Sequence, residues 1–238
     1  DGHGRSPCGL GEASTGTGGW HFRGARILRA AVDALADPSI TPHPNLGDAT
    51  DVLVTGSSAG GVGVLVHLDW VAARLPSASV RGIDDAGWVL DIAPYDPGID
   101  SPAAVMQAGY GFWSATVDET CAASTPGGEG LCYLDGHSYP FVEAPLLVQI
   151  AQMDAPQLGL LGLSLPLDMD EREYARSFAQ AIVDSLSPVG ACFSPLDRTH
   201  ALLTNDGFWT SEIGGTTCRD VVGNWFFGRA GPTKLIGM

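Results

Sequence analysis

Basic residues are scarce in this sequence, and lysine is nearly absent. The 238 residues include 12 Lys and Arg against 27 Asp and Glu, which gives a formal net charge of −15, and Lys234 is the only lysine. Proteins that bind nucleic acids hold the phosphate backbone with clusters of Lys and Arg. The composition therefore excludes nucleic acid as a partner and predicts long-range repulsion from anionic lipid surfaces and polyanions.

Long apolar runs, repeats and metal-binding spacings are also missing. No apolar run approaches the roughly 18–20 residues that span a bilayer, so no membrane partner is expected. No CxxC pair and no Cys/His grouping has the spacing of a zinc site, and neither a metal nor an organic cofactor is implied. Hydrophobic residues make up 45% of the chain and charged residues 16%, a mixture that can bury a core.

Five cysteines are present, at positions 8, 121, 132, 192 and 218. Cys121 and Cys132 flank the turn-rich sequence TPGGEG, which favours a local disulfide over two buried thiols in an oxidising compartment. Cys192 with Cys218 is a weaker second pair, and Cys8 is left over. The sequence begins at Asp1 without a signal-type apolar segment, so we expect a mature or processed protein that is secreted.

Short apolar runs alternate with helical patterns along the chain. The expected strands are 51–55, the first part of 79–87, 145–151 and 200–205, and the expected helices are 21–36, 61–75, 171–186 and 218–228. Nearly continuous apolar strands between helices predict an α/β fold, α/β-hydrolase-like, with a mostly parallel sheet covered by helices on both faces. No internal linker is visible, so residues 1–238 are expected to form a single catalytic domain.

One motif indicates nucleophilic chemistry. Gly56-Ser57-Ser58-Ala59-Gly60 matches G-x-S-x-G and lies between an expected buried strand and an expected helix, as a nucleophile elbow requires. The frame of the motif selects Ser58 as the nucleophile, and small residues around it relieve crowding in the turn. The N–H of Ala59, at the helix start, is the predicted oxyanion donor. The alternative is an ordinary glycine-rich turn between a strand and a helix.

A nucleophilic serine needs a histidine base, which follows it in the chain in this topology. Three histidines follow Ser58. His67 lies within the helix after the elbow, and His137 lies in a loop where a surface or lid role fits better. His200 lies in the last third of the chain, between a polar loop and an apolar run, and is the predicted base.

The base in turn needs an acid that orients its ring. Asp154 follows the strand 145–151 by three residues, at the sheet edge where catalytic groups of open parallel sheets collect. It is the predicted acid. Asp197 is close enough to His200 in sequence to orient the ring locally, and it is the alternative.

The N-terminal part is short for this fold. Several strands should precede the elbow strand, each strand–helix unit needs about 30 residues, and only 50 residues stand before position 51. The second oxyanion donor normally comes from an early loop. Gly18-Gly19-Trp20 is the only tempting sequence, and it runs directly into the helix 21–36. We therefore expect an N-terminal segment to be missing or carried as a separate fragment.

Four stretches of the chain resemble a known family. They are GSSAGGVGVLVHLDWVAARLP, VRGIDDAGWVLD, APLLVQIAQMDAPQL and HALLTNDGFWTSEIGGTTCRDVVGNWF. Together they resemble the Notum/pectin acetylesterase family of α/β-hydrolase-like carboxylesterases, over about residues 20–230. The resemblance implies that Ser58 is the nucleophile, Asp154 the acid and His200 the base, and it implies a family disulfide between Cys121 and Cys132.

The resemblance also implies where the oxyanion loop of the family would lie. The glycine–glycine–tryptophan oxyanion loop of the family would lie before Asp1. Residues 1–11 are similar to the segment that follows a middle strand of the family, which agrees with a missing N-terminal part.

The expected function is that of a secreted serine carboxylesterase, which removes acetyl or other acyl groups from glycans or related esters through an acyl-enzyme. The net charge of −15 disfavours polyanionic pectin and favours neutral acetylated glycans or short acyl esters. One alternative is a polyester or short-chain ester hydrolase with the same triad, whose shallow cleft Trp88, Phe112, Trp113 and Trp209 could line. The other is a hydrolase-like binding module without catalytic activity.

Overall fold

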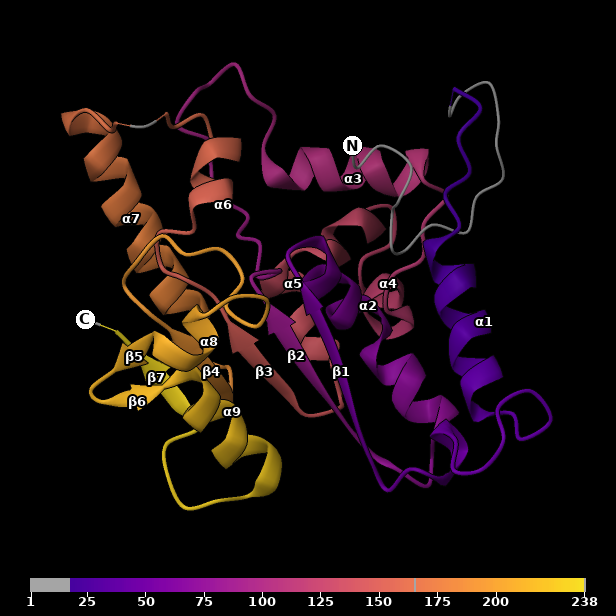
Figure 1. Cartoon of the computed structure of the whole chain (residues 1–238). Coiled ribbons are helices and arrows are strands. Elements are labelled where there is room, and N and C mark those ends of the chain that lie inside the picture. The colour runs from indigo at the N-terminus through magenta and orange to yellow at the C-terminus, as the bar shows by residue number, and fades with distance from the viewer. Residues whose placement is uncertain (1–17, 165, 238) are drawn as a thin grey trace.

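The computed structural model describes residues 18–164 and 166–237, and its centre is a parallel sheet of five strands (Figure 1). All neighbouring strands pair in parallel, so their carboxyl ends meet at one edge of the sheet. This confirms the predicted α/β fold. The strands, in their order across the sheet, are β1 (Asp51–Ser57), β2 (Ser79–Asp85), β3 (Leu146–Gln149), β4 (Ala191–Ser194) and β7 (Lys234–Ile236).

The burial of each strand follows its place in the sheet. Every residue of β3 and β4 is buried, because helices or loops cover both faces at these central positions. Strand β1 lies at an edge and alternates between exposed and half-buried residues. Leu53 on this strand is 38% exposed. Within the described ranges, the outer edge of β1 therefore has no paired strand.

One face of the sheet carries α2 (Ala59–Arg74) and α7 (Met169–Ser185), whose apolar side chains form the larger core with β3 and β4. Gly82 in β2 lets α2 approach closely, since a Cβ there would lie 2.6 Å from a methyl carbon of Leu68. Helix α7 begins with a capping box, in which Asp168 and Glu171 each accept the other's backbone N–H. The outer side of α2 packs against α1 (Gly24–Ala36), where Arg29 lies over the ring of Trp70.

The opposite face carries α9 (Cys218–Phe227) and forms a smaller core. Cys192 belongs to the larger core, whereas its neighbours on β4 and Cys218 belong to the smaller one. The weaker predicted disulfide, Cys192 with Cys218, is therefore wrong, because the two thiols lie on opposite faces of the sheet and both are free. Burial raises the pKa of Cys192 to about 11 and that of Cys218 to about 12.

Short helices lie between β2 and β3 in the chain, and the sequence did not predict them. They are α3 (Pro102–Phe112), α4 (Glu119–Ser124), η2 (Glu129–Tyr133), α5 (Asp135–Ser138) and η3 (Tyr139–Phe141). Helix α3, together with α6 (Ala155–Leu160), lies beyond the carboxyl ends of the strands (Figure 1).

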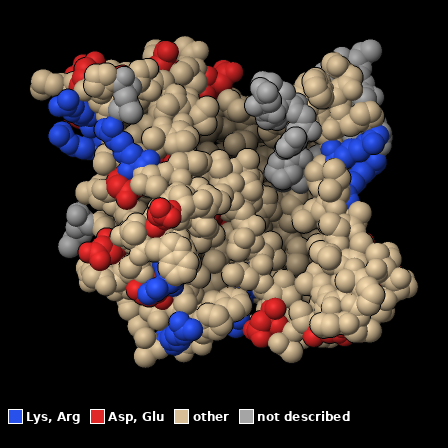
Figure 2. Space-filling view, in the orientation of Figure 1, with Lys and Arg blue, Asp and Glu red and all other residues tan. Residues whose placement is uncertain are grey.

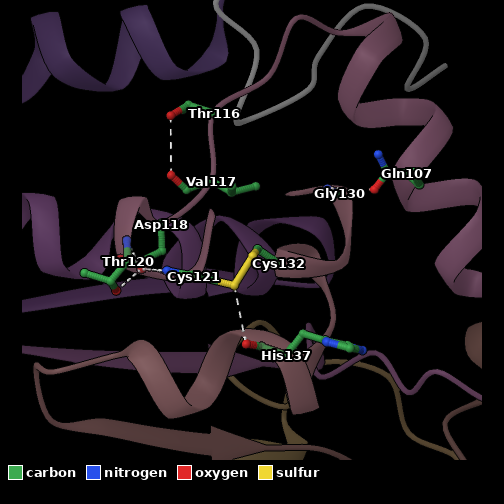
Figure 3. The surroundings of a disulfide bond; sticks show 9 residues. All are labelled: Gln107, Thr116, Val117, Asp118, Thr120, Cys121, Gly130, Cys132 and His137. Carbon is green, nitrogen blue, oxygen red and sulfur yellow. Dashed lines mark hydrogen bonds between the residues drawn. A yellow bond between two sulfur atoms is a disulfide. The ribbon is translucent and has the colours of Figure 1, made fainter. Parts of the chain in front are cut away.

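The predicted disulfide between Cys121 and Cys132 is confirmed, and it joins α4 to η2 (Figure 3). Both cysteines are fully buried. Asp118 caps α4 by accepting the N–H of Cys121, and the side chain of Gln107 accepts the N–H of Gly130. The disulfide thus lies inside a small apolar cluster that also contains Tyr133.

The predicted strand at 200–205 is wrong. Residues 202–206 form bends and turns, which lead to α8 (Gly207–Thr210) and to a hairpin of β5 (Glu212–Ile213) and β6 (Thr216–Thr217). Ala201 has a left-handed φ of 58°, and the N–H groups of Leu202 and Leu203 bond to the Asp85 side chain. Ala201 and Leu202 are buried, but a carboxylate bonds to the backbone of this run in place of a neighbouring strand.

Within the described part of the chain, no helix combines the length and apolarity that crossing a membrane requires. Cys8 and the segment 1–11 lie outside the described residues.

Candidate active site

The turn after β1 has the backbone of a nucleophile elbow. Ser58 caps α2 with a φ of 58° and a ψ of −125°, a conformation that is strained for a residue with a side chain. The turn is so tight that a Cβ at Gly56 would lie 2.1 Å from the carbonyl oxygen of Gly60. Ala59 is the first helical residue, so its N–H is one of those that an α-helix leaves without an intrahelical partner.

A Cβ atom would not fit at two of the glycines near Ser58, and it would fit at a third. A Cβ at Gly61 would lie 2.1 Å from Oδ1 of Asp84, whereas nothing lies within 4 Å of a Cβ at Gly60. The expectation that small residues relieve crowding in the turn is therefore confirmed at Gly56 and Gly61. The final glycine of the motif faces open space.

Asp154 and His200 contact each other directly. Oδ2 of Asp154 lies 2.7 Å from Nδ1 of His200. Asp154 is fully buried and caps α6, where its Oδ1 accepts the N–H of Gln157. Burial raises the pKa of Asp154, and its bonds to His200 and Gln157 oppose that rise. A carboxylate that accepts the Nδ1 proton leaves Nε2 of the imidazole as the acceptor, which is the tautomer that a general base needs.

The loops that carry these two residues run side by side beyond the ends of β3 and β4. The N–H of Gln152 donates to the carbonyl of Pro195, and that of Met153 donates to the carbonyl of Asp197. The side-chain amide of Gln152 also donates to the carbonyls of Ser194 and Gly237. Parallel pairing thus continues past the strands and carries Asp154 to the start of the loop that ends at His200.

Asp197, the alternative acid, has another role. Its Oδ1 accepts the N–H of Thr199, two residues further along the same loop. The side chain therefore shapes the turn that precedes His200, while the ring of His200 pairs with Asp154.

The other two histidines lie elsewhere. His67 is 3% exposed within α2 and belongs to the interior, as its place in the helix predicts. His137 lies in α5, where its carbonyl oxygen is 3.4 Å from Sγ of Cys121, and its ring points away from the disulfide (Figure 3).

Sequence reasoning missed Asp85, the last residue of β2. Its Oδ2 accepts the hydroxyl of Ser57, next to Ser58, at 2.5 Å. Its Oδ1 accepts the N–H of Leu202, two residues after His200, at 2.8 Å. His200 is close enough for its charge to lower the pKa of Asp85, which burial raises. The signal in the sequence was a pair of aspartates at the end of an apolar strand, where a solvated turn is the simpler interpretation.

The carboxyl groups of Asp84 and Asp135 are also buried. Burial raises the pKa of Asp84 to about 8 and that of Asp135 to about 7. Asp84 accepts the N–H of Gly87, and Asp135 accepts that of Gly136. Residues 18–164 and 166–237 contain no group of three or more His, Cys, Asp and Glu side chains that could hold a metal ion.

The aromatic residues considered for a shallow cleft are dispersed. Trp88 is 1% exposed and donates its ring N–H to Ser185. Trp113 packs against Tyr133, and Trp209 lies on α8 beside Arg219.

Comparison with known proteins identifies the family. The family model described as Pectinacetylesterase matches residues 4–164 of this sequence. The chain belongs to the pectinacetylesterase family. This confirms the resemblance to the Notum/pectin acetylesterase family that the sequence shows.

Curated relatives of this pectinacetylesterase-family chain are named as carboxylesterases and pectin acetylesterases. Palmitoleoyl-protein carboxylesterase NOTUM of Drosophila melanogaster is 30% identical over 77% of this chain and 28% of that protein. Palmitoleoyl-protein carboxylesterase notum1 of Xenopus laevis is 30% identical over 87% of this chain and 44% of that protein. Pectin acetylesterase 7 of Arabidopsis thaliana is 27% identical over 90% of this chain and 60% of that protein.

A solved structure agrees with these relatives. The Wnt deacylase Notum from Drosophila, in crystal form II, superposes with a TM-score of 0.88 and 27% identity. The match covers 98% of this chain and 68% of that one. The pectinacetylesterase-family chain thus shares the fold of the Notum α/β-hydrolase, and it spans less than half the length of the two Notum relatives above.

Proposed function

We propose that this chain is a serine carboxylesterase in which Ser58 is the nucleophile, His200 the base and Asp154 the acid. The observation that carries the proposal is the 2.7 Å contact between Asp154 and His200. Asp85 links the loop of His200 to the strained turn at Ser58, because its side chain bonds to both Ser57 and Leu202. Membership of the pectinacetylesterase family supports the reaction type.

The reaction would run in two steps through an acyl-enzyme. Oγ of Ser58 attacks the ester carbonyl while Nε2 of His200 takes its proton, and Asp154 stabilises the imidazolium that forms. The N–H of Ala59 stabilises the oxyanion, and losing one such donor typically costs about 10²–10³ in rate. His200 then gives the proton to the leaving alkoxide, and water attacks the acyl-enzyme in the same way.

An apolar cavity that is linked to the acid only through Gln157 is the proposed site of the acyl group. It has a volume of about 200 Å³ between α3 and α6 and is lined mainly by Val89, Pro102, Val105 and Leu160. Gln157 also lines it, and this residue donates its N–H to Asp154. The apolar walls of this cavity would bind the hydrocarbon of an ester substrate.

The charge of the chain supports a proposal for the alcohol portion of the ester substrate. On the face shown in Figure 2, basic side chains lie in separate groups over α7, over the start of α1 and, at the lower left, over α9. With a net charge of −15, polyanionic pectin would be repelled at low salt. Neutral acetylated glycans or short acyl esters are therefore the proposed substrates.

We also propose an oxidising, extracellular setting and a second chain segment. The buried disulfide between Cys121 and Cys132 suits a secreted protein.

The second oxyanion donor would come from an N-terminal fragment of the same precursor, for which the open edge of β1 leaves room in the part of the chain that the structure describes. Intact mass spectrometry of the purified protein tests whether such a fragment accompanies the chain.

The catalytic assignment is tested with two serine variants. Ser58→Ala should abolish both p-nitrophenyl acetate hydrolysis and labelling by a fluorophosphonate. Ser177→Ala, at an exposed position on α7, is the matched control and should leave both intact. Hydrolysis or labelling that survives in Ser58→Ala would overturn the proposal. A wild-type protein that folds but does neither would favour the binding module.

A further inference from the structure

Asp85 holds two separate loops with one side chain. It is fully buried at the end of β2, and its carboxylate oxygens accept the hydroxyl of Ser57 and the N–H groups of Leu202 and Leu203. The Leu203 contact is 3.2 Å long. In the orientation that satisfies both of its own ends, the Gln149 amide also donates to Oδ1 of Asp85.

These donors belong to the segments that carry the proposed nucleophile and base. Ser57 immediately precedes Ser58, and Leu202 follows His200 by two residues. The backbone of Asp85 contributes as well, because its carbonyl accepts the N–H of Ser58 at 2.7 Å. One residue of the central sheet is therefore bonded to both sides of the reaction centre.

The backbone around Ser58 and around Ala201 must be fixed by bonds from other parts of the chain. Ser58 and Ala201 each have a φ of 58°, a left-handed conformation that residues with side chains adopt at a cost. Such conformations persist where surrounding bonds fix the chain. In this fold, Asp85 supplies bonds at the residue next to Ser58 and at the two residues that follow Ala201.

The bonds require a carboxylate. The hydroxyl, the two backbone N–H groups and the Gln149 amide all donate to Asp85. An ionised carboxylate is an acceptor at every lone pair, whereas an amide at this position would turn an NH₂ group toward one set of donors. Asp85→Asn therefore keeps the size of the side chain and breaks its bonding to one of the two loops.

We propose that Asp85 is a positioning residue, whose carboxylate fixes the loop of His200 against the elbow of Ser58. The inference rests on the proposed esterase function. Asp85 touches neither the substrate nor the reacting atoms in this role. Its effect is on geometry, and misplacing a catalytic group by about 1 Å can cost about 10²-fold in rate.

The main test compares neighbouring aspartates in steady-state hydrolysis of p-nitrophenyl acetate. Asp85→Asn should lower kcat by about 10–10²-fold with little change in KM, because the apolar cavity is untouched. Asp84→Asn is the matched control, equally buried and bonded only to the N–H of Gly87, and it should retain the wild-type kcat. Equal kcat values in Asp85→Asn and the wild type would overturn the inference.

A second variant covers the case in which Asp85→Asn does not fold. Ser57→Ala removes one of the bonds to Asp85 and leaves the others in place. It should lower kcat several-fold at constant KM, and a wild-type kcat in Ser57→Ala would overturn the inference. Where Asp85→Asn folds, the Ser57→Ala/Asp85→Asn double variant should lose less than the product of the two single fold-losses in kcat, because both act through one contact. A loss equal to that product would also overturn the inference. Failure of the esterase proposal is recognised separately, by activity that survives in Ser58→Ala.

Discussion

Asp84 and Asp85 are adjacent and fully buried, yet their side chains leave β2 toward different faces of the sheet. Asp84 points to the α2 side, where its Oδ1 would meet a Cβ at Gly61, and Asp85 points to the turn at Leu202. Oδ2 of Asp84 has no hydrogen-bond partner, while both oxygens of Asp85 accept bonds. The alternation of a strand thus separates a carboxyl group with one unbonded oxygen from a carboxyl group whose two oxygens both accept hydrogen bonds.

Replacing Asp84 should change how stability depends on pH. Burial raises the pKa of Asp84 to about 8 from an ordinary value of 3.8, so the folded chain holds a proton that the unfolded chain releases. Between these values the free energy of unfolding falls with rising pH, by up to about 1.4 kcal/mol per unit for one group. Asp84→Asn lacks this loss. Its free energy of unfolding should therefore rise relative to that of the wild type between pH 5 and pH 8.

Urea denaturation at pH 5, 6, 7 and 8 measures the difference. Asp206→Asn, at an exposed position, is the control. A gap between Asp84→Asn and the wild type that stays constant over this range would contradict the prediction.

The glycines of the elbow should differ in tolerance. Gly56→Ala and Gly61→Ala place a Cβ about 2.1 Å from another heavy atom, so each should lower the free energy of unfolding by several kcal/mol, with loss of esterase activity. Gly60→Ala meets nothing within 4 Å and replaces a helical glycine, so its stability should rise by up to about 1 kcal/mol. Thermal unfolding of the three variants tests this order, and a severe defect in Gly60→Ala would refute it.

The choice of acid can be tested with amide substitutions. Asp154→Asn should lower kcat by about 10³–10⁴-fold, because an amide can hold the imidazole in the wrong tautomer and leaves its cation without a counter-charge. Asp197→Asn keeps an oxygen to accept the N–H of Thr199 and should have a small effect. The reverse ranking of the two kcat values would assign the role to Asp197.

The apolar cavity predicts a dependence on acyl length. Val105→Trp fills the space between α3 and α6 and should lower kcat/KM for p-nitrophenyl octanoate at least tenfold more than for the acetate. Val105→Ala enlarges the same wall and should not penalise the longer ester. Equal losses on the two esters in Val105→Trp would place the acyl group elsewhere.

The disulfide should contribute to stability mainly by restricting the unfolded chain. Cys121 and Cys132 are 11 residues apart, and closing a loop of this size corresponds to about 3 kcal/mol. The Cys121→Ser/Cys132→Ser double variant should lose that amount in urea denaturation, and a reducing agent should destabilise the wild type while leaving the double variant unchanged. A reducing agent that affects both equally would contradict this prediction.

The parts of the fold that the sequence predicted correctly are those in which local pattern and core packing agree. The strand at 51–55 and the helix after it have clear apolar patterns, and together they frame the elbow of Ser58. The strand predicted at 145–151 forms at Leu146–Gln149, so Asp154 follows its carboxyl end as expected. A site that depends on the edge of a parallel sheet can be located once the strands are known.

The parts that failed depend on contacts between distant residues. The apolar run at 200–205 resembles a strand, but Asp85, more than a hundred residues earlier, satisfies its backbone in a turn. The free thiols of Cys192 and Cys218 are separated by the sheet, which their spacing in the chain does not reveal. Strands β4 and β7 are only four and three residues long, too short for periodicity to show.

Because Ser58, Leu202 and Leu203 all donate their amides to the same residue of β2, these three amides should be protected from solvent exchange to a similar degree. Loosening either loop would release bonds that also steady the other. The reaction centre would then open and close as one cooperative unit, and no half-assembled form with an ordered serine and a free imidazole would accumulate.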